Sequence, residues 1–486
     1  IVTGTTTMTG NSTVSGTLDV TGVLTGTSLD ISGDIDVDGT SNLDVIDVDG
    51  AANFAADVTF ADGADIITAS AGTSNFRAGV NAGNSIESGG NYNTVVGDEA
   101  GTAITTGDDN VGVGYNSLGA NTTGTRMTSV GSRSGMQNTT GNYNAFVGYD
   151  AGESNTTGAS NTFIGDSAGR ETTTTSNNTA VGQSALLANT TGANNVAVGA
   201  LALDANTTAD NNVAVGYASL GANTTGTANV AMGFGALDAN TTADNNTALG
   251  YNALTANTTG TENVAVGAGA LTANTTGSYN HAFGRNAGAS ITTGDTNIAI
   301  GNAALGTATT ADGNTAVGHS ALSANTSGSS NVGVGLNVLD ANTTGANNTA
   351  VGAASLGANT TGSELVAIGT SALAANTTAA NNVAVGYQAL DANTTGSENN
   401  ALGYGALGAN TTAQNNNAFG TLALGANTTG AGNTAVGNSA LDANTTADNN
   451  VAVGYASLGA NTTGAGNAAL GKSTMAANTT GNNNTA

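Results

Sequence analysis

Two histidines are the first side chains in this sequence to weigh for acid–base or metal chemistry. His281 precedes Ala-Phe-Gly, whereas His319 directly follows a glycine, so the two occupy different positions of a repeat described below, two units apart. A catalytic or metal-binding pair needs side chains within hydrogen-bond or ligand distance. Two strand spacings separate the histidines by about 10 Å. We therefore interpret the chain as non-enzymatic and expect no catalytic residue and no cofactor.

A short acidic run near the start of the sequence imitates a calcium-binding loop. Asp34, Asp36 and Asp38 alternate with Ile and Val and are followed by a glycine, as in the first half of an EF-hand loop. The twelfth position of that loop is Val45, where a bidentate Glu would be expected. The alternation also fits a solvated acidic face of a β-strand. The three aspartates remain weak calcium candidates, and we expect no other metal site.

The element that positions most side chains is a repeat of 17 residues. Every seventeenth residue from Gly97 to Gly471 is glycine, which gives 23 grid glycines with no insertion or deletion between them. A strict period of this length is typical of a solenoid, in which each repeat is one coil stacked on the next. We predict an all-β fold, a parallel β-roll of about 23 coils.

Each coil is expected to hold a short strand before its grid glycine. In Val213-Ala-Val-Gly216, large β-branched residues alternate with alanine, as a strand requires. Both faces are apolar, so both are expected to be covered. We expect the small-residue face to lie against partner chains in a homotrimer. That face carries Ala197, Ala214, Ala231 and Ala265.

Leucine occupies the fourth position after the glycine in most coils, and we predict a second short strand there. Five coils have glycine instead, and in three of these a Phe before the grid glycine is expected to fill the lost volume. Asn residues before the strand and in the Asn-Thr-Thr corner are expected to turn the chain and to form ladders between coils. The three pairs are Gly152 with Phe146, Gly169 with Phe163, and Gly288 with Phe283.

Tyrosine directly follows the grid glycine in seven coils, and a row of such rings could stack on sugars. The alternative is that the rings only cover an edge of the coil. A flat threonine array would indicate ice binding, but here the paired threonines are adjacent in a corner. Asn-Thr-Thr also matches the N-glycosylation acceptor. The candidate glycan contacts are Tyr217, Tyr251, Tyr387 and Tyr404.

The composition excludes several classes of partner. Net charge is −27 with only six Lys and Arg residues, so nucleic-acid binding is not expected. No apolar run approaches the roughly 18 residues of a membrane-spanning helix. The absence of Pro among 486 residues fits a chain whose backbone N–H groups are needed in β-ladders.

Three regions are predicted. Residues 1–75 carry short Gly-punctuated strands and 11 of the 33 acidic residues, which indicates an intertwined β-stalk. Residues 76–96 form a transition or capping coil, because Gly79 lies 18 rather than 17 residues before Gly97. Residues 97–486 form the β-roll. The first residue is Ile1 and not Met, and we expect the roll to continue beyond 486 in a longer polypeptide.

The coil sequence Asn-Asn-Val-Ala-Val-Gly-Tyr, beginning at Asn211, resembles the Asn-Ser-Val-Ala-Ile-Gly repeat of the YadA-like head of trimeric autotransporter adhesins. The Asn-Thr-Thr-Gly corner is similar to repeats of phage tail-fibre and bacterial surface proteins. The resemblance covers residues 93–486. It implies a left-handed, trimeric roll in an extracellular fibre, adhesin or receptor-binding appendage, with a host-surface glycan or protein as a further partner.

Overall fold

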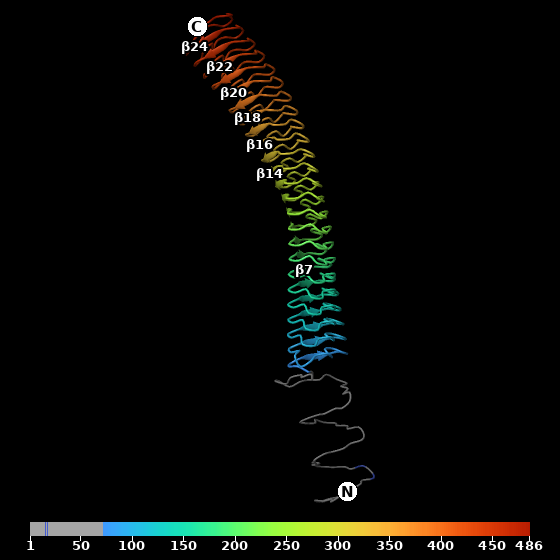
Figure 1. Cartoon of the computed structure of the whole chain (residues 1–486). Coiled ribbons are helices and arrows are strands. Elements are labelled where there is room, and N and C mark those ends of the chain that lie inside the picture. The colour runs from blue at the N-terminus through green and yellow to red at the C-terminus, as the bar shows by residue number, and fades with distance from the viewer. Residues whose placement is uncertain (1–14, 16, 18–70) are drawn as a thin grey trace. The chain divides into compact units, whose positions relative to one another are not determined.

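The computed structural model describes residue 15, residue 17 and residues 71–486. Within these residues the prediction of an all-β parallel solenoid is confirmed: 24 three-residue strands lie side by side in a single parallel sheet (Figure 1). The strands are β1 (Phe76–Ala78), β2 (Thr94–Val96), β3 (Val111–Val113), β4 (Thr128–Val130), β5 (Ala145–Val147), β6 (Thr162–Ile164), β7 (Thr179–Val181), β8 (Val196–Val198), β9 (Val213–Val215), β10 (Val230–Met232), β11 (Thr247–Leu249), β12 (Val264–Val266), β13 (His281–Phe283), β14 (Ile298–Ile300), β15 (Thr315–Val317), β16 (Val332–Val334), β17 (Thr349–Val351), β18 (Val366–Ile368), β19 (Val383–Val385), β20 (Asn400–Leu402), β21 (Asn417–Phe419), β22 (Thr434–Val436), β23 (Val451–Val453) and β24 (Ala468–Leu470).

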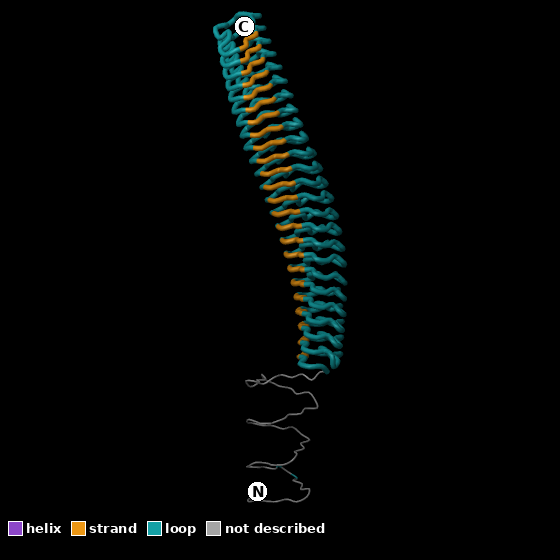
Figure 2. Tube along the Cα trace, turned by 60° about the vertical axis from the view of Figure 1, so that its left-hand side comes forward, coloured by secondary structure: helices purple, strands orange, loops and turns teal. Residues whose placement is uncertain are grey.

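Register follows the repeat. Val213 of β9 pairs with Val230 of β10, which pairs with Thr247 of β11, so equivalent residues of successive coils lie side by side. β1 pairs with β2 in the same parallel manner, although Phe76 and Thr94 are 18 residues apart. The strands therefore form one continuous strip along the column of coils, with the loops beside it (Figure 2).

The grid glycine ends each strand because no side chain fits there. Gly216 has φ of +136°, and an added Cβ would lie 2.5 Å from the carbonyl oxygen of Gly233 in the next coil. Glycine adopts this backbone angle without steric cost. The corner after the strand thus requires glycine, which explains the unbroken 17-residue grid.

The small-residue face of the strands lies inside the coil, which corrects our expectation that it would face partner chains. Ala214 and Ala231 are fully buried and belong to the same hydrophobic core as Leu220 and Leu237. A 17-residue coil encloses a narrow interior, and alanine on one side leaves room for leucine on the other. The larger β-branched residues therefore point outward. The other two alanines of the predicted face, Ala197 and Ala265, are buried in the same way.

Volume compensation is confirmed for two of its three predicted pairs. A Cβ at Gly152 would lie 2.7 Å from the ring of Phe146, and one at Gly169 would lie 2.6 Å from that of Phe163. The third pair is wrong, because the side chain of Phe283 points outward and is 41% exposed. Ile291 instead lies against Gly288, 3.1 Å from the position of an added Cβ.

The leucine segment contains no second strand, contrary to the prediction. Leu220 has φ of +52°, and the residue two before it, Ala218, has φ of +51°. Such left-handed angles cost L-residues about 1–2 kcal/mol each. They bend the chain tightly enough to turn the leucine side chain into the core, where its burial offsets that cost.

The buried asparagines that directly precede the strands in sequence form a hydrogen-bonded ladder from coil to coil. The backbone N–H of Asn212 donates to Oδ1 of Asn195 at 2.9 Å, and its own Nδ2 donates to the carbonyl of Gly226 at 2.9 Å. Equivalent bonds recur between successive coils, while Met127 and Leu365 replace the asparagine in two coils and are buried. The ladder confirms the expected role of these asparagines and joins neighbouring coils.

A second ladder runs through the Asn-Thr-Thr corners. Nδ2 of Asn223 donates to Oδ1 of Asn206 at 3.0 Å and to the carbonyl of Gly226 at 3.0 Å. The ladder is interrupted once by Thr172 and once by Ile291 and Ala308 in two successive coils. Each interruption leaves the preceding asparagine with an unpaired acceptor. Among the described residues, the buried side-chain oxygens without a partner are Oδ1 of Asn155 and Oδ1 of Asn274.

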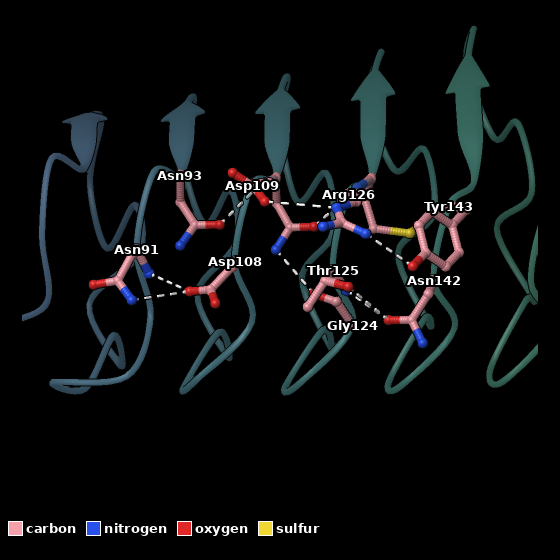
Figure 3. Close-up of polar contacts among 11 residues, drawn as sticks. Asn91, Asn93, Asp108, Asp109, Gly124, Thr125, Arg126, Asn142 and Tyr143 are labelled. Carbon is pink, nitrogen blue, oxygen red and sulfur yellow. Dashed lines mark hydrogen bonds and ion pairs between the residues drawn. The ribbon is translucent and has the colours of Figure 1, made fainter.

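A third contact between coils occurs at the corner that follows the Asn-Thr-Thr turn. The backbone N–H of Asn91 donates to Oδ1 of Asp108 at 2.7 Å, and that of Thr125 donates to Oδ1 of Asn142 at 2.7 Å (Figure 3). The same bond joins Ala193 to Asp210. In mostly alternate coils, a side-chain oxygen at this corner thus accepts a hydrogen bond from a backbone N–H of the preceding coil.

Candidate functional site

The most extensive surface feature is the outer strand face, which we define as the first and third residues of strands β2–β24. These 46 positions hold mainly Val, Ile and Thr, and none of them is Asp, Glu, Lys or Arg. Several large apolar residues on this face are well exposed, including Met232 at 42% and Leu402 at 49%. Because each coil contributes two such residues, the face is an uncharged apolar strip along the column.

Aromatic rings form short stacks beside the strands. Tyr217 and Tyr251 are not neighbours, but Phe234 lies between them, with ring centroids 5.3 and 5.5 Å apart. Tyr387 stacks on Tyr404 at 5.7 Å. All five rings are about half exposed. Sequence reasoning missed Phe234 because only tyrosine was considered at this position, although phenylalanine follows the grid glycine there too.

Two arginines of the early coils, Arg126 and Arg133, contact tyrosine rings and carboxylates. Arg126 donates to the hydroxyl of Tyr143 at 2.9 Å and lies 3.7 Å from Asp109 (Figure 3). Arg133 makes two hydrogen bonds to the carboxylate of Asp150, at 2.8 and 2.7 Å. The hydrogen bond that Arg133 donates to the carboxylate of Asp150 raises the pKa of Arg133. These cations are engaged within the chain.

The two histidines lie in different surroundings. His281 opens strand β13 on the outer strand face and is exposed. His319 follows the grid glycine of β15, and its Nδ1 is 3.0 Å from the hydroxyl of the adjacent Ser320. The sheet register places the two histidines two coils apart and at different positions of the repeat, as the sequence indicated.

Several aspartates extend over a glycine of a neighbouring coil. A Cβ at Gly221 would lie 2.9 Å from an oxygen of Asp238 and 3.5 Å from one of Asp204. Burial raises the pKa of the Asp204 carboxyl, and the charge of Asp238 raises it further. Burial also raises the pKa of Asp238. The same burial effect holds for Asp340, Asp391 and Asp442.

The described part of the chain holds no cluster of three His, Cys, Asp or Glu side chains that could bind a metal ion. The calcium candidates Asp34, Asp36 and Asp38, and the predicted stalk, lie outside the described residues. A shallow hollow lies over the coils of β13–β15, lined by small residues such as Ala289, Gly306 and Ser323.

The asparagines of the Asn-Thr-Thr corners, such as Asn223, are fully buried and bonded in the ladder, except Asn478 of the last corner, which is partly buried. No protein-family model matches the chain, and no curated protein sequence is significantly similar to it. Over the residues that the structure places, no helix has the length and apolar character needed to cross a membrane.

Proposed function

We propose that this protein is a non-enzymatic structural subunit of an extracellular fibre, assembled as a homotrimer. The fibre would be an adhesin or receptor-binding appendage, either a phage tail fibre or a bacterial surface fibre. The observation that carries the proposal is the uncharged outer strand face, which continues through 23 strands. The resemblance of the coil to YadA-like heads supports the trimer and a left-handed roll.

Self-association explains the distribution of charge. The chain carries a net charge of −27, and copies of it would repel each other wherever their acidic side chains approached. The outer strand face is free of carboxylates and presents apolar side chains such as Met232, Leu402 and Phe419. Further copies of this chain share the same repeat, so a weak contact per coil adds up along the column. A small globular partner would cover only part of the strip.

A receptor-binding role for the fibre is supported by the exposed aromatic stacks. Tyr217, Phe234 and Tyr251 form one stack and Tyr387 and Tyr404 another. Aromatic rings of this kind provide apolar surface with polar edges, which sugars and protein side chains both use. A host-surface glycan is the first ligand to test, and these five residues are the positions to change.

The assembly is tested by sedimentation and light scattering of the whole chain. We expect about three times the chain mass of 46.3 kDa. Changing Val213, Val230 and Val264 together to Glu should give a monomer with an unchanged β-sheet signal, because the new carboxylates would be desolvated in the assembly.

The matched control changes Thr225, Thr242 and Thr259 to Glu. These threonines are exposed at the Asn-Thr-Thr corner of three coils, away from the strands. The control adds the same charge and should remain assembled. A monomeric native protein, or equal dissociation of both variants, would contradict self-association through the outer strand face.

A further inference from the structure

His281 is the only titratable side chain among the 46 positions of the outer strand face. It occupies the first position of β13, where most other coils have Val or Thr. Its imidazole is exposed, and no hydrogen bond or ion pair to it is present among the described residues. This coil therefore differs from all the others on the surface proposed to join the copies.

The surroundings of His281 on this face are apolar. Val264 and Val266 of β12 lie on one side, and Ile298 and Ile300 of β14 lie on the other. Phe283 is the other outward residue of the same strand and is 41% exposed. The face thus offers the imidazole no carboxylate.

The nearest charged residues in sequence lie outside the three strands. Glu262 precedes β12 by two residues, Asp295 precedes β14 by three, and Arg285 follows β13 by two. None of the three forms an ion pair with His281. An equivalent face of another copy brings the same apolar residues and a second His281.

We propose that His281 makes self-association of the chain sensitive to pH, so that the copies separate as its imidazole gains a proton. The inference rests on the proposed assembly through the outer strand face. A neutral imidazole can be covered by apolar side chains at moderate cost, whereas a cation covered without a partner is strongly disfavoured. In a homomeric assembly with coils in register, each copy adds a cation at the same level, and these cations repel each other.

The experiment measures the assembly state of the whole chain by sedimentation at about pH 8 and about pH 5.5, which lie on either side of the range in which imidazoles generally titrate. For the native chain we expect the concentration at half-assembly to rise at least about tenfold on acidification. For a trimer this is a change of roughly 2.8 kcal/mol, because its dissociation constant scales with the square of that concentration. His281→Thr should abolish this rise, because threonine occupies the same position in Thr247 and Thr315 of other coils.

The matched control is His319→Asn. It removes the other histidine, which lies off the strands, and asparagine stands at the equivalent position as Asn302 and Asn438. This variant should keep the native pH response. If the native chain is assembled equally at both pH values, or if His281→Thr responds to pH as the native chain does, the role of His281 is wrong while self-association stands. A chain that is monomeric even at about pH 8 would refute the proposed assembly itself.

Discussion

Replacing Thr172 with Asn should stabilise the coils around it, because it repairs a gap in the corner ladder. In regular coils Nδ2 of one asparagine donates to Oδ1 of the preceding one, as Asn223 does to Asn206 at 3.0 Å. Thr172 offers no such donor, and Oδ1 of Asn155 is left buried without a partner. On the other side, Nδ2 of Asn189 donates to the carbonyl of Gly192 in its own coil, and its contact with the preceding coil is a long bond to the hydroxyl of Thr172, at 3.5 Å.

The expected gain follows from these contacts. Providing a partner for a buried unsatisfied acceptor is worth about 1–3 kcal/mol. The new side chain also fits, because Asn155 itself lies in a coil with a buried Phe146 and a glycine at 152, as Thr172 lies with Phe163 and Gly169. Overpacking therefore does not offset the gain.

Amide hydrogen exchange read by mass spectrometry is the suitable assay, since a column of coils opens locally rather than all at once. Peptides covering residues 155–190 should exchange about 5- to 150-fold more slowly in Thr172→Asn. The matched variant Asn223→Thr creates the same gap in a regular coil and orphans Oδ1 of Asn206, so its neighbouring peptides should exchange faster by a similar factor. Unchanged or faster exchange in Thr172→Asn would refute the energetic role assigned to the ladder.

Two other perturbations test the core and the partly buried aspartates. Ala231→Phe alone should speed local amide exchange, since overpacking costs about 1–3 kcal/mol. Adding Leu237→Gly to the same chain should recover part of this loss of stability, because Phe146 and Gly152 form such a pair in another coil. Equal exchange with and without Leu237→Gly would contradict volume exchange between these two positions. Burial raises the pKa of Asp204 and Asp238 in the folded chain, so the coils around them should become more stable as pH falls through those raised values. Their exchange should slow on acidification after correction for intrinsic rates, and Asp204→Asn should reduce that dependence; an identical pH profile in the variant would contradict the assignment.

The period of the sequence was sufficient to predict the stacking and the register. A 17-residue step with glycine at every corner leaves only one way to pair Val213, Val230 and Thr247. The asparagine ladders were also predictable, because buried amides at a fixed repeat position can satisfy each other only between coils. The individual donors and acceptors depend on how the corner folds, which the repeat pattern does not specify.

The direction of the strand faces was not predictable from polarity. In Val-Ala-Val both faces are apolar, and the pattern alone does not say which of them lies inside. The choice depends on the width of the coil interior. It accommodates Ala231 opposite Leu237 but would not accommodate large side chains at both positions. The left-handed backbone angle of Leu220 was also not predictable from the sequence. Leucine disfavours that conformation and adopts it here to close the coil.

The corner caps bear on how the length of such a protein can change during evolution. Asp210 caps the N–H of Ala193, and Asp244 caps that of Thr227, so each acidic cap serves the coil before it. Losing a single coil, such as residues 200–216, would place Thr227 rather than Asp210 opposite Ala193. Losing two adjacent coils would instead bring Asp244 to that place and preserve the bond. Where the caps alternate, genetic gain or loss in steps of two coils therefore preserves the bond at the junction, and the natural unit of lengthening there is the pair.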